Sequence, residues 1–278
     1  MTNTSTKLDE LLDLSHALGD PTHDWAVLGE GNTSTRLNKE TFLVKASGSE
    51  LRTLTGEQVS EVRFAPVMEA LDSGRDYSDL ETKDLLLGAC AGGAGRMPSV
   101  ETLLHAYLLT LPGIDFIGHT HVTSINGLLC SLEGWKAIES GGRLFPDEIV
   151  VCGVAPCSVP YVDPGLPLAR ALRDQVIAYI QRYEAAPKTI YLRNHGFIAL
   201  GKSAQEVRNV TLMADKSARV LLAALACGTP VYLTPENVTR IQTRPDEHYR
   251  QKALGMAALL RSPDLPGLLA GRRARSRK

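Results

Sequence analysis

The sequence predicts an α/β fold, and three observations support this prediction. Short apolar runs typical of strands alternate with segments of helical periodicity along most of the chain. The 278 residues, 44% of them hydrophobic, suffice for one large domain with a substantial core. Neither an internal repeat nor a low-complexity segment stands out before the C-terminal tail. We therefore expect one domain over residues 1–260, followed at 261–278 by a basic, flexible tail.

The start of the chain predicts a helix followed by three strands. Leucines recur close to the helical period over residues 8–18, and the run stops before Gly19 and Pro21. Strand-like segments follow at 25–28, 33–37 and 41–45. Two glycine-bearing turns, at 29–32 and 46–49, are expected to present backbone N–H groups to an anion.

The first of these turns does not predict a dinucleotide site. Gly29 and Gly31 match the beginning of the fingerprint, but Ser34 stands where a third glycine is needed. A strand also follows where that motif requires a helix. The pattern therefore excludes a Rossmann-type nucleotide site.

Helices and strands alternate through the rest of the chain. Helical periodicity predicts helices at 66–71, 80–91, 101–111, 125–132, 166–183, 204–226 and 235–240, the last continued at 248–260. Strands are predicted at 114–125, 148–153, 157–161 and 189–192, the last continued by 197–200.

Three histidines give the strongest functional signal in the sequence. Side chains two residues apart on a strand project from the same face, so His119 and His121 can reach one metal ion. His195, directly before Gly196, would complete a three-nitrogen site with an open position, the arrangement of a catalytic zinc. An ordinary, partly buried histidine pair is the alternative interpretation.

Glu101 is the candidate acid/base residue. It opens the predicted helix that leads directly into the strand of the histidines, so it approaches the metal if the helix start lies at the far end of that strand. Burial beside Val100 is expected to raise the pKa of Glu101 toward neutrality. His105, one turn later, is expected to pack or to support the site rather than to bind the metal.

Composition excludes two classes of partner. A net charge of −1 and an aromatic content of 5% do not suit nucleic-acid binding. No apolar run reaches the roughly 18 residues of a membrane span, and the N-terminus lacks a signal-peptide pattern. Five scattered cysteines fit reduced thiols. We therefore expect a cytoplasmic protein that binds neither nucleic acid nor membranes.

Five motifs, in order, make the chain resemble the class II aldolase/adducin superfamily, which includes fuculose-phosphate aldolase and ribulose-phosphate 4-epimerase. They lie within residues 8–228 and read Gly31-Asn-Thr-Ser34, Ala46-Ser-Gly48, Pro98-Ser-Val-Glu101, His119-Thr-His121 and Asn194-His-Gly196. The resemblance implies a three-layer α/β/α domain around a mostly antiparallel sheet. It also implies a homotetramer with sites between subunits.

The resemblance also implies a role for each motif. His119, His121 and His195 would hold Zn²⁺, with Mn²⁺, Co²⁺ or another divalent cation as alternatives. Glu101 would move the proton at the substrate carbon. The phosphate or carboxylate of the substrate would be held by Asn32, Ser47, Gly48 and Ser99.

The implied activity is that of a divalent-metal-dependent lyase. It would cleave a carbon–carbon bond by retro-aldol chemistry in a small ketose phosphate or related polyhydroxy carbonyl compound. The metal would stabilise the resulting enediolate as a Lewis acid. Decarboxylation of a 3-keto sugar acid, with or without phosphate, is an alternative. A non-catalytic, adducin-like interaction module is a second alternative, against which the complete ligand set and Glu101 argue.

The chain departs from the fuculose-type pattern at two places. Val100 replaces a second serine, which removes a hydroxyl from the anion site. The tyrosine acid that a neighbouring subunit supplies in that family has no match in the expected stretch, residues 143–148. Candidates for a second acid are Asp147, Glu148, His248 and Tyr249, each with a surface or structural role as the alternative interpretation.

Overall fold

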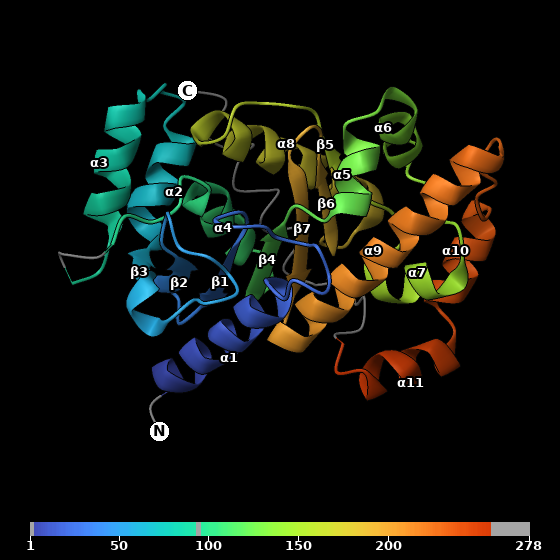
Figure 1. Ribbon diagram of the computed structural model, residues 1–278, viewed down its shortest axis with the longest axis horizontal. Coiled ribbons are helices and arrows are strands. Elements are labelled where there is room, and N and C mark those ends of the chain that lie inside the picture. The colour runs from blue at the N-terminus through green and yellow to red at the C-terminus, as the bar shows by residue number, and fades with distance from the viewer. Residues whose placement is uncertain (1–2, 93–95, 257–278) are drawn as a thin grey trace.

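The computed structural model describes residues 3–92 and 96–256. In this part of the chain, one seven-stranded sheet is covered on both faces by helices (Figure 1), which confirms the predicted α/β fold. The predicted tail at 261–278 lies outside the described residues. Among the helices described, none is both long enough and apolar enough to cross a bilayer.

The sheet is mostly antiparallel, as the resemblance implied. Its order is β3-β2-β1-β4-β7-β6-β5, and only β5 and β6 pair in parallel. The strands are β1 Asn32–Arg36, β2 Thr41–Lys45, β3 Val59–Arg63, β4 Phe116–Thr120, β5 Cys157–Val159, β6 Thr189–Leu192 and β7 Gly196–Gly201.

Two hydrophobic cores separate the three layers. Residues alternate between the faces of a strand, so on β4 Ile117 packs into one core and Phe116 into the other. The first core contains residues of α2 Phe64–Asp72, α3 Asp79–Ala89, α4 Thr102–Leu109 and α8 Leu166–Tyr183. The second contains residues of α1 Asn3–Leu18, α5 Thr123–Leu129, α6 Leu132–Glu139, α7 Pro146–Cys152 and α9 Ala204–Cys227. The chain continues into α10 Pro235–Gln242 and α11 Pro245–Ala253.

Gly118, at the centre of β4, lets two helices lie close to the strand that carries His119. A Cβ atom there would be 2.6 Å from Leu18 Cδ1 and 2.8 Å from Val207 Cγ1. Leu18 ends α1 and Val207 lies near the start of α9, and Figure 1 shows the end of α1 next to the start of α9. The strand is therefore held in place by direct packing of helix side chains on its backbone.

Two predicted strands are wrong. Residues 25–28 lie in an irregular loop, and Leu28 and the preceding Asp24 both have positive φ values of 55°. Residues 148–153 belong mostly to helix α7, because Pro146 and two acidic residues form a favourable first turn ahead of the β-branched run. Strand β3 was not predicted, and neither was helix α6, because the helix predicted at 125–132 corresponds to α5 and reaches only the first residue of α6.

The segments that carry the histidines are shorter than predicted. Strand β4 ends at Thr120, so His121 follows the strand, and α5 begins at Thr123. Strands β6 and β7 form an antiparallel hairpin rather than one continuous strand. His195 therefore lies in the turn between them, after Asn194 with a φ of 52°.

Gly118→Ala is predicted to lower the free energy of unfolding by about 1–3 kcal/mol, the usual cost of overpacking a core. Urea denaturation measures the change. Gly127→Ala is the matched control, because a Cβ there meets nothing within 4 Å and helix α5 gains propensity. Equal stability of Gly118→Ala and wild type would contradict the packing described for β4.

Candidate metal centre and acid/base site

Three imidazoles converge at one end of the sheet. His119 is the next-to-last residue of β4, and His121 follows that strand. His195 lies in the β6–β7 turn, which is close to both because β4 pairs with β7. The ring centroids are 5.0–5.4 Å apart, and one ligand atom of each residue lies within 4.8 Å of the others. The structure thus brings together the three histidines that the sequence analysis identified.

The turn after His195 leaves room for the other two rings. A Cβ on Gly196 would be 2.7 Å from His121 Cδ2 and 3.0 Å from His119 Cε1. Asn126 Nδ2 donates a hydrogen bond of 3.2 Å to the carbonyl oxygen of His195 and fixes the turn to α5. The absence of a side chain at position 196 is therefore a condition for the convergence.

The hydrogen bonds of His119 orient its lone pair. Its Nδ1–H donates to the carbonyl oxygen of Phe197 at 3.1 Å, so the lone pair is on Nε2. Burial lowers the pKa of His119 to about 3, against the opposing effect of Glu101, so the ring is neutral near pH 7. Burial also lowers the pKa of His121, with Glu30 opposing.

The geometry fits a divalent cation. The Nε2 atoms of His119 and His121 lie 3.2 Å apart, close to the roughly 3.3 Å that tetrahedral zinc with bonds of about 2.0–2.1 Å requires. Two neutral nitrogens whose lone pairs face each other beside a carboxylate repel one another unless a cation or a proton lies between them. Three imidazole nitrogens are a donor set that suits zinc and other borderline divalent ions.

Glu101 lies against these nitrogens. It stands at the N-cap position of α4, where its side chain makes no capping hydrogen bond. The residue is buried, with Oε1 2.9 Å from His195 Nε2 and Oε2 3.4 Å from His119 Nε2. Asn32 Nδ2 donates to Oε2 at 2.5 Å. The start of α4 therefore lies at the C-terminal end of β4, where the histidines are, and this is the placement that brings Glu101 close to them.

The ionisation of Glu101 differs from the expectation. Burial raises the pKa of Glu101, but His119, the hydrogen bond from His195 and the amide of Asn32 outweigh it and hold the pKa below its usual range. The expected shift toward neutrality is therefore wrong. Val100, the expected cause, is 39% exposed, and the immediate neighbours of the carboxylate are polar.

The proposed anion-binding residues lie around Glu101 but differ in availability. Ser99 Oγ accepts hydrogen bonds from the backbone N–H of Glu101 and from Asn32. Ser47 and Gly48 are exposed, and Ser47 N–H donates to Met97 O, which ties this turn to the segment before Ser99. Asn32 Nδ2 is already engaged, whereas its buried Oδ1 has no partner among the described residues.

The sequence analysis missed two charged residues of this region. Lys45 ends β2, is 2% exposed, and donates to the carbonyl oxygen of Gly29 at 3.3 Å. Burial lowers its pKa, and Glu101 opposes that effect. Glu30, between two glycines, lies 3.5 Å from His121 Nδ1. A lysine at the end of an otherwise apolar strand, next to Ala46-Ser-Gly48, was the available signal.

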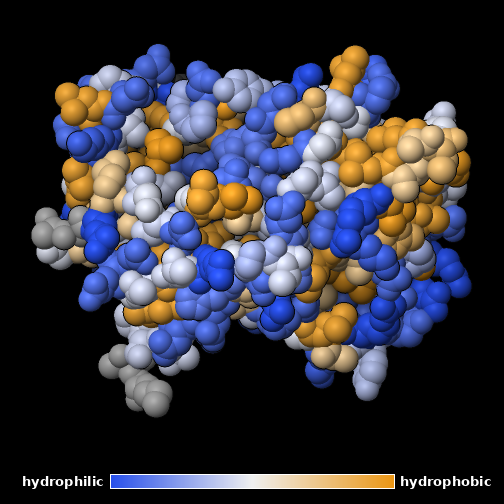
Figure 2. Space-filling view, in the orientation of Figure 1, coloured by the Kyte–Doolittle hydropathy of each residue, from blue (hydrophilic) through white to orange (hydrophobic). Residues whose placement is uncertain are grey.

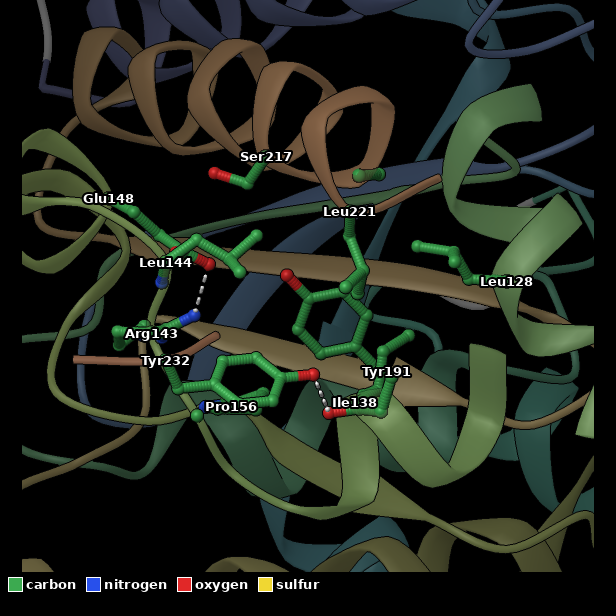
Figure 3. Close-up of a pocket in the computed structure, with 13 residues that line it drawn as sticks. Leu128, Ile138, Arg143, Leu144, Glu148, Pro156, Tyr191, Ser217, Leu221 and Tyr232 are labelled. Atoms are coloured by element: carbon green, nitrogen blue, oxygen red, sulfur yellow. Dashed lines mark hydrogen bonds and ion pairs between the residues drawn. The ribbon is translucent and has the colours of Figure 1, made fainter. Parts of the chain in front are cut away.

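Three of the four candidates for a second acid have other partners, and the fourth, Tyr249, is exposed. Glu148 forms a buried ion pair with Arg143 at 3.0 Å, beside a cavity of about 30 Å³ that Figure 3 shows with Tyr191 and Tyr232 around it. Asp147 pairs with Arg250. His248 contacts the carbonyl oxygen of Gln242, and Tyr249 is exposed. These contacts support structural and surface roles within the chain.

His105 is a buried residue of α4 that contacts β1 next to the site. It is fully buried in α4, and its Nδ1 lies 2.6 Å from Ser34 Oγ. Burial lowers the pKa of His105 to about 4, against the opposing effect of Glu101. The residue therefore links α4 to β1 as a neutral side chain, in agreement with the supporting role expected for it.

Comparison with known proteins identifies the family. The family model described as "Class II Aldolase and Adducin N-terminal domain" matches residues 9–222. The 3-oxo-tetronate 4-phosphate decarboxylase of Haemophilus influenzae is 26% identical over 79% of this chain and 89% of its own length. The methylthioribulose-1-phosphate dehydratase of Bacillus subtilis is 27% identical over 72% and 85%.

A further relative and a solved structure complete the comparison. The uncharacterized oxidoreductase YuxG of Bacillus subtilis is 24% identical over 66% of this chain, which spans only 25% of the length of that protein. The structure of YgbL from Klebsiella pneumoniae has a TM-score of 0.65 at 22% identity, covering 87% of this chain and 99% of YgbL. This likeness shows a shared fold.

Gly196→Ala is predicted to weaken divalent-metal binding on the order of tenfold or more, the scale seen when ligand orientation is disturbed. The added methyl group must displace the rings of His119 and His121, whose atoms lie within 3.0 Å of its position. Competition with a chromophoric zinc chelator measures the affinity, and Gly127→Ala is the control. Unchanged affinity in a folded Gly196→Ala protein would contradict the packing of the histidines.

Proposed function

We propose that this chain, which belongs to the class II aldolase and adducin family, is a divalent-metal-dependent carbon–carbon lyase. The observation that carries the proposal is the contact of the Glu101 carboxylate with two imidazoles of a three-histidine group. His119, His121 and His195 would hold the cation, with zinc as the first choice and Mn²⁺ or Co²⁺ as alternatives. An adducin-like interaction module would require neither the ligands nor the acid.

The chemistry follows from where charge develops. A bound divalent cation would supply Lewis-acid stabilisation of the negative charge on the substrate oxygens. Retro-aldol cleavage leaves the bonding electron pair on the retained fragment as an enediolate. Glu101 lies beside the ligand nitrogens, where it can take the proton of the hydroxyl group that becomes the aldehyde or return one to the carbon. The lowered pKa of Glu101 favours its starting as a base.

The substrate we propose is a small phosphorylated polyhydroxy carbonyl compound. Ser47 and Gly48 are exposed, and Asn32 contacts both Ser99 and Glu101. The buried ammonium of Lys45 adds positive charge in the same region, since Glu101 is the charge that acts on it. Hydroxyls, backbone N–H groups and an ammonium together suit a phosphate.

Decarboxylation of a 3-keto sugar acid phosphate is the second candidate. The similarity to 3-oxo-tetronate 4-phosphate decarboxylase over most of both chains favours it. This reaction builds the same kind of charge, but carbon dioxide leaves without a hydroxyl proton being removed. It therefore needs only one proton at the carbon that loses carbon dioxide, and no second acid. Because Glu101 starts ionised, it would pass on a proton taken from a water molecule.

The assembly we propose is the homotetramer that the family resemblance implies, in the cytoplasm. The structure described here is of one chain. Sedimentation equilibrium of the purified protein tests the assembly, and a monomer would contradict it.

Metal removal and product analysis test the proposed function together. Activity toward a panel of four- to six-carbon keto sugar phosphates and 3-keto acid phosphates should disappear on chelation and return with Zn²⁺, Mn²⁺ or Co²⁺. An aldehyde product identifies the aldolase, and released carbon dioxide identifies the decarboxylase. Full activity in the metal-free protein would exclude both reactions as proposed.

Glu101→Gln is predicted to keep the fold and the bound metal but to lower turnover on the order of 10² or more, the scale of losing general acid/base catalysis. The amide has the size of the carboxylate but cannot exchange the proton. Steady-state kinetics measures kcat, and Glu133→Gln, on an exposed helix face, is the control. Turnover within twofold of wild type would show that Glu101 is only the residue at which α4 starts.

Ser99→Ala is predicted to raise KM for a phosphorylated substrate about tenfold, the value of one hydrogen bond to a charged group. The unphosphorylated analogue should be almost unaffected, because it lacks the group that the hydroxyl binds. Comparing the two substrates with both proteins measures the difference. An equal rise in KM for both substrates would show that Ser99 positions Asn32 and Glu101 and does not bind the phosphate.

A further inference from the structure

The two histidines of the His-x-His segment have different partners behind the converging nitrogens. His119 Nδ1 faces the neutral carbonyl oxygen of Phe197. His121 Nδ1 faces the Glu30 carboxylate, with Oε1 at 3.5 Å. The contact is on the side of the His121 ring away from His119, because Nε2 is the nitrogen that lies 3.2 Å from His119 Nε2. Glu30 is therefore placed behind the ring and not among the converging atoms.

Hydrogen bonds within the loop before β1 hold the Glu30 side chain in this position. The backbone N–H of Val27 donates to Glu30 Oε2 at 2.9 Å, and Glu30 N–H donates back to the carbonyl oxygen of Val27 at 3.1 Å. This reciprocal pair immobilises one carboxylate oxygen and leaves Oε1 for His121. The loop also accepts a hydrogen bond from buried Lys45 at Gly29.

The residue after Glu30 fixes the direction in which the loop enters the sheet. Gly31 has a φ of +68°, and a Cβ there would be 2.6 Å from the carbonyl oxygen of His119. Only glycine permits both that conformation and that approach. The backbone beside Glu30 is thus packed directly on the strand that carries the histidines.

We propose that Glu30 is a positioning residue for His121. The carboxylate accepts the Nδ1–H of the ring, fixes the tautomer that leaves the lone pair on Nε2, and makes that nitrogen a stronger donor to the cation. This inference rests on the proposed metal site, because it assigns a role to Glu30 through one of its ligands. Nothing in the family resemblance or in the sequence analysis assigned a role to this residue.

The exposure of the pair sets the expected size of the effect. The side chains of His121 and Glu30 are 22% and 42% exposed, so solvent screens the charge of the carboxylate. Losing the hydrogen-bond partner of a metal-bound histidine typically lowers metal affinity by about 10- to 100-fold. We expect a value near the lower end, with orientation of the ring as the larger part.

Zinc affinity of the purified, full-length chain tests the proposal. Competition with a chromophoric chelator should show that Glu30→Ala binds Zn²⁺ about tenfold more weakly than wild type. Glu30→Gln keeps an acceptor for the ring N–H but loses the charge, so its affinity should lie between the two. Binding of Zn²⁺ by Glu30→Ala within twofold of wild type would overturn the proposal.

Glu81→Ala is the matched control. Glu81 accepts the backbone N–H of Ser78, three residues earlier, just as Glu30 accepts that of Val27, but it caps the exposed start of α3. Its loss therefore removes the same type of local hydrogen bond without a metal ligand nearby. The zinc affinity of Glu81→Ala should equal that of wild type, and a loss as large as that of Glu30→Ala would show that the effect is one of general loop stability.

Nitrogen-15 NMR of the histidine rings measures the tautomer of His121, which would not change if Glu30 only stabilised the loop. In the metal-free wild type and in Glu30→Gln, His121 should be protonated at Nδ1, whereas Glu30→Ala should populate both tautomers. The same tautomer in all three proteins would overturn the proposal. If the wild type itself binds no Zn²⁺, the proposed metal site is wrong. If the wild type binds Zn²⁺ and the Glu30 variants bind it equally well, the metal site stands and the role proposed for Glu30 is wrong.

Discussion

The contact between the Glu101 carboxylate and the imidazoles of His119 and His195 is the interaction on which the rest of the site depends. A buried carboxylate is costly unless donors surround it, and here His195 and the amide of Asn32 donate to it. The lone pair of His119 Nε2 also faces the carboxylate, an arrangement that a cation between them would stabilise. Those partners come from β4, the β6–β7 turn and β1. The contact therefore fixes where α4 must begin relative to three strands of the sheet.

Close packing of the backbone makes that contact possible. Gly118 admits α1 and α9 to one side of β4, Gly196 leaves space for the rings of His119 and His121, and Gly31 lets the loop with Glu30 lie on the strand. Each position would bring a Cβ within 2.7 Å of a neighbour. The site is thus held by the same packing that holds the centre of the sheet, so metal affinity and stability should respond together to changes in these glycines.

Much of the site could be predicted from the sequence, because its main residues stand in short local patterns. The period-2 spacing of His119 and His121 and the position of Glu101 at a helix start survive small errors in element bounds. The place of Lys45 at the end of a strand was a signal in the sequence, but its contacts and those of Glu30 could not be predicted in this way. Each gains its partner only when β1 and β2 are placed beside β4. The β-branched run at 148–153 was misassigned because its helical first turn outweighs its strand propensity.

Anomalous diffraction from crystals of the zinc-loaded protein, recorded on both sides of the zinc absorption edge, tests the central claim most directly. The structure predicts one strong peak per chain, at about 2.0–2.1 Å from one ring nitrogen of each of His119, His121 and His195, with the Glu101 carboxylate beside it. Full occupancy at another position, or no peak between the three rings, would contradict the assignment of these histidines as the ligands and with it the proposed chemistry.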